Sequence, residues 1–356
     1  MFKSIINKLF NWYFRPKSLD LRLWQMSLIF ISIFTVSGTV GVINIFWSSP
    51  DGETVNINYS LSDTIPILIS YASFIFGALF AILAVFRAMQ HEKKNPNIFI
   101  EHIGLRSSRN QSLSEAAKKK TGLGSTLFID TSNYYENSIL KDNAKALDYT
   151  IEVFNNSIEN ITHHCDTRNI SLHYGGTPSV PIGFSLGYKI GNTSKVSLWD
   201  FNRESSEWYA LEDIFYDSNT PVIDFNKYNN EKEVCILMGF SFPVSEEQVG
   251  TRLNGKGIIN ITMPKTKDDS MNSLLKLEEF QQKFRGLLKT LASDGVSRIH
   301  IFCAAQASLN FSLGRQIERT HPECVVYEYV NDSSLDTQYP WGVLLNSKGT
   351  PPSIIT

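Results

Sequence analysis

The sequence lacks the short motifs that mark many enzymes and metal proteins. It has no Gly-x-Ser-x-Gly elbow, no Walker phosphate loop and no paired-cysteine motif. Its four cysteines, Cys165, Cys235, Cys303 and Cys324, are scattered along the chain. The last three lie in strongly apolar segments that look like core strands. This is expected for reduced thiols in a domain on the cytoplasmic side. The sequence therefore predicts neither a disulfide framework nor an enzyme.

The histidines also lack the spacing of a metal site. His163 and His164 are followed by Cys165 and Asp166, but this order does not match the ligand spacing of structural or catalytic zinc. We interpret the segment as an amphipathic loop. The sequence predicts no metal, no cofactor and no catalytic residue.

Charge is absent from two long apolar runs, which the net charge of −2 and the mean hydropathy of −0.12 conceal. No charged residue or histidine occurs in the 25 residues Leu23 to Trp47 or in the 23 residues Thr64 to Phe86. Each run is long enough to cross a hydrocarbon core of ~30 Å as a helix. A cleaved signal peptide is the alternative, but the first run is too long and lacks a cleavage pattern. We predict two transmembrane helices within 23–86, joined by a short periplasmic loop at 48–63.

The flanking charges predict how these helices are oriented. Basic residues precede the first run and follow the second, whereas all charged residues of the loop between them are acidic. By the positive-inside rule both termini then face the cytoplasm. Residues 1–22 mix apolar and basic side chains, which suits a cytoplasmic or interfacial segment. Ser73, Gly77 and Ala81 recur at four-residue spacing, which permits close helix packing.

The chain becomes polar after the second run. We interpret residues 87–124 as a linker with some helix, and Lys118, Lys119 and Lys120 within it as a solvated face. The remaining residues, 125–356, are enough for an α/β domain of two halves, about 125–230 and 231–356.

An internal repeat supports these two halves. Phe184-Ser185-Leu186-Gly187 recurs as Phe311-Ser312-Leu313-Gly314, and His173 recurs as His300, at the same offset of 127 residues. Each copy runs from an apolar strand through small residues into a helix, and then to a strand with an aromatic and acidic pair. Leu198-Trp199-Asp200-Phe201 aligns in this way with Val326-Tyr327-Glu328-Tyr329. A duplicated α/β unit follows.

The expected binding site lies where the strands of such a sheet end. Turns there expose backbone N–H groups, and helix N-termini favour anions. Small residues admit a ligand to the backbone, and aromatic rings stack on bases. An alternative is that the aromatic residues belong to the core and the glycines serve as turns. The candidate ligand-binding residues are Thr131, Ser132, Gly175, Gly176, Thr177, Pro178, Ser179, Trp199, Phe201, Ser241, Phe242, Ala304, Ala305, Gln306, Tyr327 and Tyr329.

The chain resembles a known family at this point. The segments 234–241 and 299–305, Gly314, the run Val326 to Tyr329 and the pair Tyr339-Pro340 resemble a SAVED domain, which fuses two CARF-like (Rossmann-like) subdomains. Such domains occur in the bacterial anti-phage systems called CBASS. The two apolar runs in front resemble those of transmembrane SAVED effectors.

The resemblance implies a membrane effector of the bacterial inner membrane. It implies that the domain binds a cyclic oligonucleotide, expected to be a trinucleotide, made by a partner nucleotidyltransferase during phage infection. Binding would drive homo-oligomerisation, disruption of the lipid bilayer and abortive infection, without contact to a DNA or RNA duplex. Arg203 and Arg315 are phosphate partners by type, with a surface position as the alternative.

Two other functions remain open from the residues alone. A membrane-anchored phosphodiesterase that cleaves cyclic oligonucleotides would need His173 and His300, although their place within strands argues against an acid or base role. A membrane adaptor without enzymatic activity would make no use of the duplicated small-residue turns.

Overall fold

The structure is a computed structural model of the full chain. It describes residues 23–32, 42–48, 54–60, 64–94, 96–104, 112–136, 139–162, 170–202, 205–212, 217–332 and 334–356. The chain divides into two compact units, Met1–Lys94 and Asn95–Thr356. The expectations for residues 1–22, for Arg203 and for His163 to Asp166 lie outside the described residues.

The described part of the first unit contains two helices and a hairpin. Residues 23–32 form a short helix, strands β1 (Val42–Ser48) and β2 (Thr54–Ser60) pair antiparallel, and α3 spans Thr64–Lys94. Phe30 lies 5.6 Å from Phe80 between ring centroids and packs the short helix on α3. A Cβ on Gly77 would lie 2.9 Å from Ile31 Cγ1 and 3.3 Å from the Ser27 carbonyl oxygen, so this small residue does permit close helix packing.

The first apolar run differs from the expected continuous helix. Its last residues form strand β1, and strand β2 occupies part of the expected loop at 48–63. Val42, Ile43 and Ile45 are β-branched, and the alternating polar and apolar residues of β2 provide a matching partner strand. Within the described part of the chain, no helix combines the length and the apolar character needed to cross a membrane.

The second unit begins with a five-stranded sheet in the order β4-β3-β7-β8-β9. Strands β3 (Asn97–Ile103), β4 (Gly124–Asp130), β7 (Ser171–Gly176) and β8 (Val196–Asn202) run parallel, and β9 (Glu207–Ala210) closes the edge antiparallel. The connecting elements are α4 (Leu113–Thr121), η1 (Ser132–Tyr134), β5 (Tyr135–Glu136), β6 (Ile139–Leu140), α5 (Asn143–Thr162) and α6 (Val180–Ile190).

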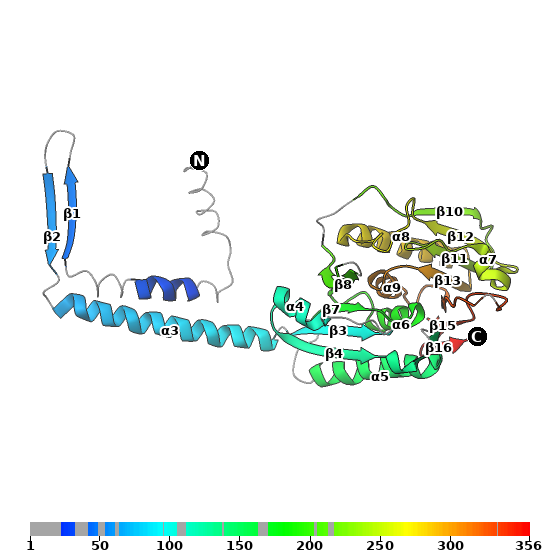
Figure 1. The fold of residues 1–356 in the computed structure, drawn as a ribbon, viewed down its shortest axis with the longest axis horizontal. Coiled ribbons are helices and arrows are strands. Elements are labelled where there is room, and N and C mark those ends of the chain that lie inside the picture. Colours follow the sequence, from blue (N-terminus) through cyan, green and yellow to red (C-terminus); the bar gives the residue numbers. More distant parts are fainter. Residues whose placement is uncertain are drawn as a thin grey trace. The chain divides into compact units, whose positions relative to one another are not determined.

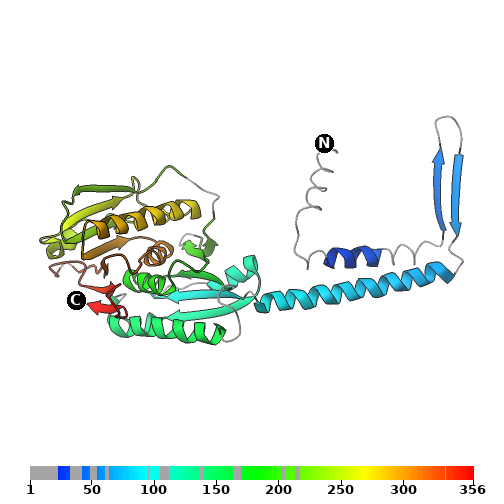
Figure 2. The same ribbon diagram turned by 180° about the vertical axis from the view of Figure 1, so that it is seen from behind.

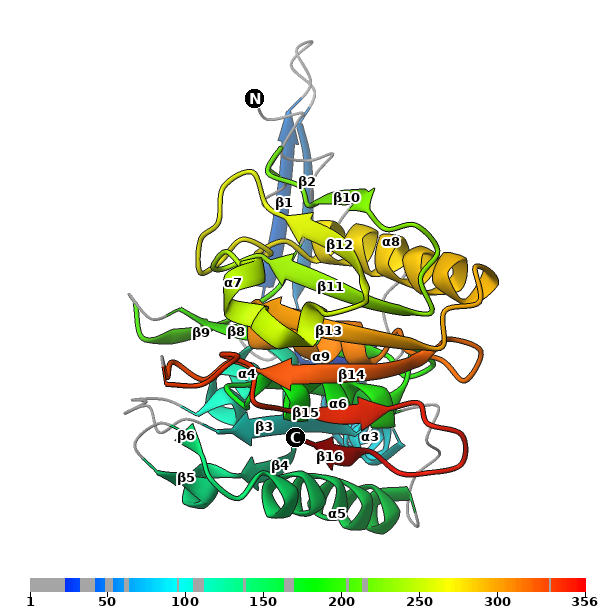
Figure 3. The ribbon, with the colours of Figure 1, turned by 90° about the vertical axis from the view of Figure 1, so that its right-hand side faces the viewer.

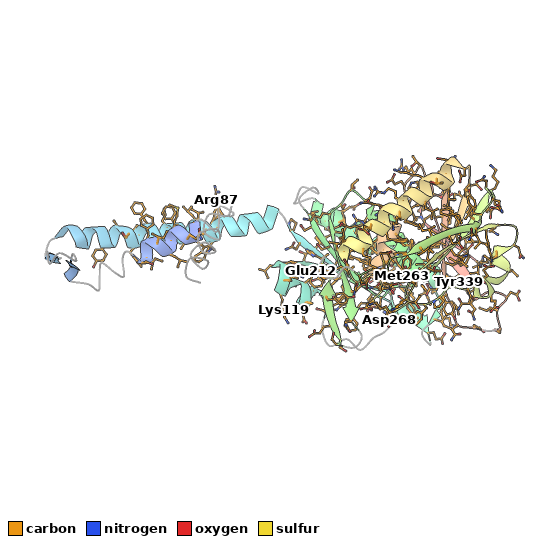
Figure 4. The ribbon with its side chains drawn as sticks, turned by 90° about the horizontal axis from the view of Figure 1, so that it is seen from above. Arg87, Lys119, Glu212, Met263, Asp268 and Tyr339 are labelled. Atoms are coloured by element: carbon orange, nitrogen blue, oxygen red, sulfur yellow. The ribbon has the colours of Figure 1, made fainter. Side chains whose placement is uncertain are left out.

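Strand β3 and helix α4 occupy the segment expected to be a linker, 87–124. Ile98, Phe99 and Ile100 are fully buried, and β3 lies between β4 and β7 in the sheet. The apolar run is three residues long and stands between polar residues, so the sequence signal of this central strand is weak. On α4, Lys119 is exposed and points away from the domain (Figure 4), whereas Lys120 pairs with Glu212.

The second sheet has seven strands in the order β10-β12-β11-β13-β14-β15-β16, which Figure 3 shows from one side. Strands β11 (Glu233–Gly239), β12 (Gly257–Thr262), β13 (Arg298–Ala304) and β14 (Glu323–Glu328) are parallel. Strands β10 (Val222–Lys227), β15 (Trp341–Leu345) and β16 (Ser353–Ile355) are antiparallel additions. The helices of this half are α7 (Glu246–Val249), η3 (Gly250–Leu253), α8 (Leu274–Ser293) and α9 (Ala307–Gly314).

The two sheets share one hydrophobic core. Helices α8, α9, α6 and α5 lie in that order between them (Figures 1 and 2), and their apolar faces join residues of both sheets in a single cluster. Smaller clusters cover the opposite sheet faces, with Phe99, Leu113 and Trp199 in the first half and Leu237, Phe302 and Tyr327 in the second. The two halves therefore form one folded unit.

The element order confirms the duplicated α/β unit. The order β4-β3-β7-β8-β9 in the first sheet corresponds to β12-β11-β13-β14-β15 in the second. In this correspondence β3 is the counterpart of β11 and β4 is the counterpart of β12, so the first half begins at β3, before the expected boundary at 125.

Candidate functional site

Each half has a point where successive connections leave the sheet in opposite directions. In the first half this switch point lies between β3 and β7, and in the second it lies between β11 and β13. Open α/β sheets bind ligands beyond the carboxyl ends of the strands at such points. Gly175 to Ser179 follow one switch point, and Ser241 with Ala304 to Gln306 follow the other.

The small residues at the first switch point let the backbones approach closely. The Thr177 N–H donates to the His102 carbonyl oxygen at 2.8 Å. A Cβ on Gly176 would overlap the backbone of His102, so no larger residue fits there without a shift. Gly176 is therefore required by packing, whatever else it does.

The second switch point presents side chains as well as backbone. The N–H groups of Phe240 and Ser241 both donate to the Ala304 carbonyl oxygen at 2.9 Å. Phe242 follows directly and is 60% exposed, so its ring is available for stacking. Ala305 is half-buried, and its methyl side chain adds little bulk beside the backbone.

Thr131 and Ser132 lie one strand away from the switch point, because β4 is an outer strand. The Thr131 hydroxyl and backbone N–H both donate to the Ile103 carbonyl oxygen at 2.8 Å. The Ser132 N–H donates to Asp130 Oδ1 at 2.9 Å. Thr131 therefore holds the end of β4 against β3, and Ser132 forms a local turn at the end of β4.

The four candidate stacking aromatics fall into two groups. Trp199 and Tyr327 are 3% and 2% exposed and belong to the core, as the alternative interpretation expected. Phe201 is half-buried with its ring 5.4 Å from Trp208. Tyr329, which directly follows β14, is 40% exposed and is therefore more accessible than Phe201 on β8.

His102 is a buried polar residue at the first switch point that sequence reasoning missed. Its side chain is fully buried at the carboxyl end of β3, and neither ring nitrogen has a hydrogen-bond partner. Burial lowers the pKa of His102 to about 3, so the imidazole is neutral and offers one donor and one acceptor. Tyr174, whose ring centroid is 6.4 Å away, also has an unpartnered hydroxyl. Recognition of β3 as a strand was the signal needed to find His102.

The helix that follows each switch point is capped by a carboxyl group of the other half. Glu328, at the end of β14, accepts from the Val180 N–H of α6 at 2.9 Å. Asp200, on β8, accepts from the Ser308 hydroxyl of α9 at 2.5 Å and from its N–H at 3.3 Å. Burial raises the pKa of Asp200 to about 6 and that of Glu328 to about 8. The contacts place the start of each helix beside a strand of the other half, α6 beside the end of β14 and α9 beside β8.

The repeated tetrapeptide lies where the halves meet. A Cβ on Gly187 would overlap the Phe311 carbonyl oxygen, and a Cβ on Gly314 would overlap that of Phe184. Each glycine therefore admits the backbone of the other helix, which explains why Phe-Ser-Leu-Gly occurs twice. Helices α6 and α9 cross here in closer contact than side chains at both positions would allow.

Arg315 has a role that neither expectation foresaw. It is 8% exposed, and its guanidinium donates to the carbonyl oxygens of Gly191, at 2.8 Å, and Ser194. Burial lowers its pKa to about 10. Arg315 therefore joins the end of α9 to the loop after α6 instead of lying on the surface.

The repeated histidines lie within their strands, away from the switch-point loops. His300 contacts Tyr327 Oη at 2.9 Å and Glu233 Oε2 at 3.0 Å, so both of its ring nitrogens have partners. His173 contacts Asn97 Oδ1 at 3.3 Å. Among the described residues, no group of three His, Cys, Asp or Glu side chains is placed to hold a metal ion.

A comparison with solved structures finds several that are similar to this chain. The Acinetobacter baumannii Cap4 SAVED/CARF-domain receptor in complex with 2′3′3′-cAAA is 14% identical, with a TM-score of 0.49, over 76% of this chain and 58% of that one. The Moraxella osloensis Cap4 receptor is 15% identical, with a TM-score of 0.43, over 76% and 56% of the two chains. This chain thus spans less than two thirds of either receptor. A comparison with curated proteins finds no match.

Two family models match the sequence. Residues 1–147 match the SAVED-fused 2TM effector domain. Residues 154–345, more than half of the chain, match the SMODS-associated and fused to various effectors sensor domain, SAVED. The order of the two matches agrees with a SAVED-domain transmembrane effector. The chain therefore belongs to the SAVED family.

Proposed function

We propose that this protein is a membrane effector that senses a cyclic oligonucleotide at the paired switch points of its SAVED domain. The observation that carries the proposal is the contact between the halves. Glu328 contacts the first residue of α6, and Asp200 contacts Gln306 and Ser308 at the start of α9, so each ligand-facing edge adjoins the other half. A ring with several phosphates and bases suits a site that is built from two similar edges.

The chemistry of the two loops supports this ligand class. Exposed aromatic rings stack on bases for ~1–3 kcal/mol each. Phe242 and Tyr329 are exposed aromatics of the second half, and Thr177 contributes a hydroxyl from the first. The ligand is expected to be a cyclic trinucleotide made by a partner nucleotidyltransferase.

The first unit supplies the proposed output. It matches a 2TM effector domain, and its two long apolar runs suit a bilayer. Ligand binding would assemble copies of the chain and bring their membrane segments together, which would disrupt the bacterial inner membrane and abort infection. An interface between different surfaces of neighbouring copies can grow without closing.

A binding screen with the full chain in detergent tests the sensor. We expect one member of a panel of cyclic di- and trinucleotides to bind tightly, to increase the particle mass in light scattering, and to be recovered intact. Cleavage of the bound ring would instead support the phosphodiesterase. Failure of every panel member to bind would contradict the proposed sensor and favour the adaptor.

A matched pair of substitutions locates the site. Ala305→Trp places a bulky ring at the second switch point and should abolish binding. Ala292→Trp places the same ring at a half-buried position near the end of α8, by the amino end of β13, and should leave binding unchanged. Equal binding by both variants would show that the ligand does not use this edge.

Dye release tests the output. The full chain is reconstituted in vesicles of phosphatidylethanolamine and phosphatidylglycerol, and the panel member that binds is added. We expect rapid release with the wild-type chain and none with Ala305→Trp. Binding and assembly without any release would contradict membrane disruption and leave the sensor intact.

A further inference from the structure

Helices α6 and α9 begin differently from α4, α5 and α7 of the C-terminal unit, although Ser273 before α8 likewise makes no side-chain cap hydrogen bond. Helix α4 is capped by Ser112, which accepts from the Glu115 N–H at 3.2 Å, and α7 carries a capping box built on Ser245. At α5, Asp142 accepts from the Lys145 N–H at 3.3 Å. These three caps come from the residues directly before each helix, as is usual.

The N-cap residues of α6 and α9 make no such hydrogen bond. Ser179 precedes α6 and Gln306 precedes α9, and neither side chain caps its own helix. Neither helix has an acidic residue in its first turn. The first backbone N–H groups would therefore lack a local partner. The Val180 N–H donates to Glu328 and the Ser308 N–H donates to Asp200, and both carboxyl groups come from the opposite half.

The exchange of carboxyl groups is reciprocal in the repeat. Asp200 and Glu328 occupy matching positions in β8 and β14, each between two aromatic residues. Asp200 also accepts from the Gln306 side-chain amide at 3.2 Å, while the Gln306 carbonyl oxygen accepts from the Met271 N–H at 2.8 Å. Asp200 thus orients a side chain of the second switch-point loop as well as the helix.

The surrounding contacts make this link stiff. The close approach at Gly187 and Gly314 leaves no side chain between α6 and α9 to absorb a relative shift. Tyr174 of the first sheet stacks on Phe311 of α9, with ring centroids 3.7 Å apart and planes at 12°. A displacement of one switch-point loop is therefore transmitted to the other half.

We propose that Asp200 and Glu328 are positioning residues that couple the two switch points, each holding the ligand-facing helix of the opposite half in place. The inference rests on the proposed function, because the loops that it couples are the proposed ligand site. A ligand that moves either loop must move the carboxyl group from the other half, so both halves respond together.

Hydrogen exchange of the full chain in detergent, without ligand, tests the link directly. Glu328→Ala should speed exchange of the Val180 N–H by about fivefold or more and leave Ser308 unchanged. Asp200→Ala should do the reverse. Glu328→Gln and Asp200→Asn keep an oxygen that accepts a hydrogen bond, so they should restore slow exchange. Asp142→Ala is the control, and it should speed exchange at Lys145 within its own half.

The pattern of exchange decides between coupling and ordinary stability. Faster exchange confined to the mutated half, or spread evenly over the chain, would overturn the inference. So would fast exchange in the conservative variants, because they keep the hydrogen bond. If an alanine variant does not fold, the Gln and Asn variants still show whether an acceptor at these positions holds the opposite helix.

A ligand titration completes the test, with cyclic tri-adenylate as the first probe and the rest of the panel after it. Each alanine variant should weaken binding by about fivefold or more, and the Gln and Asn variants should recover it. Unchanged binding by the alanine variants would overturn the coupling of the link to the site. If the wild type binds none of the probes, the proposed function is contradicted. The hydrogen-exchange pattern would still show whether Asp200 and Glu328 hold the helices of the opposite half.

Discussion

The two halves of the C-terminal unit share a strand order but differ in how their buried polar groups are satisfied. In the second half, His300 joins Glu233 and Tyr327 in a chain of hydrogen bonds. In the first half, the counterpart His173 contacts Asn97 and keeps one ring nitrogen unpartnered. The duplication thus preserved the backbone pattern while the side-chain chemistry diverged.

The contrast is sharper at the switch points. His102 on β3 pairs in register with Gly176, and its counterpart on β11 is Met238, which pairs with Cys303. Met238 suits a buried position, whereas His102 buries two polar atoms without partners. Such groups are rare in native proteins and call for an explanation, such as a water or a ligand. At this position the first half therefore carries an unmet hydrogen-bonding capacity that the second half lacks.

The largest expected effect comes from removing β3, because the first half then lacks the counterpart of β11. A fragment of residues 125–356 loses the strand between β4 and β7, whereas a fragment of residues 95–356 keeps it. We expect the shorter fragment to show no cooperative unfolding and the longer one to unfold in a single transition, measured by circular dichroism. Cooperative unfolding of the shorter fragment would show that the second half folds alone.

The next effect concerns the contact between the halves. Gly187→Ala and Gly314→Ala each place a methyl group against a carbonyl oxygen of the other helix, so each should cost about 3 kcal/mol or more of unfolding free energy. Gly286→Ala is the control, because a Cβ there meets nothing within 4 Å on α8. That variant should gain about 1 kcal/mol. Denaturant titration measures all three.

Equal losses for Gly187→Ala and Gly314→Ala would show that the two helices bear on each other symmetrically. A loss for one variant alone would mean that the other helix can move away. A neutral result for both would contradict the close approach.

A pH titration separates the two carboxyl caps. The pKa of Glu328 rises from 4.5 to about 8 on folding, so between these values the folded state holds a proton that the unfolded chain has released. Stability contributed by this group therefore falls as pH rises through that window. Between pH 6.5 and 8 the wild type should lose about 2 kcal/mol relative to Glu328→Gln.

Asp200→Asn is the comparison for this titration. The pKa of Asp200 rises from 3.8 to about 6, so its effect should end near pH 6 and leave the range above it unchanged. Chemical denaturation at a series of pH values measures both variants. A flat difference between the wild type and Glu328→Gln from pH 6.5 to 8 would contradict the raised pKa of Glu328.

Much of this arrangement could be predicted from the sequence, and the rest depends on contacts that no local pattern reports. The repeat predicted the duplicated unit, and the strand-end rule located Gly176 and Ala305 at the switch points. Strand β3 was missed because its apolar run is three residues long. Trp199 lies in the core because α4 covers that face of the sheet, whereas the sequence indicated some helix in this segment but assigned it to a linker. The exchange of Asp200 and Glu328 follows from the packing of the halves, which the sequence pattern does not specify.

The smallest expected effect tests the contrast between His102 and Met238 directly. His102→Met gives the first half the residue of the second and removes two unpartnered polar atoms, so it should stabilise the protein by about 1–3 kcal/mol at pH 7. The pKa of His102 falls from 6.5 to about 3 on folding, so the unfolded chain binds the extra proton between these values. The wild type therefore loses stability as pH falls below 6.5, and the advantage of His102→Met should widen there.

Ligand binding by the same variant shows what the histidine is for. A more stable protein that binds the cyclic oligonucleotide less tightly would mean that the first half retains His102 at a cost to stability in order to contact the ligand. Unchanged binding together with higher stability would make His102 a leftover of the divergence between the halves. A less stable His102→Met would mean that a buried water satisfies the imidazole, and the contrast between the halves would then be one of hydration.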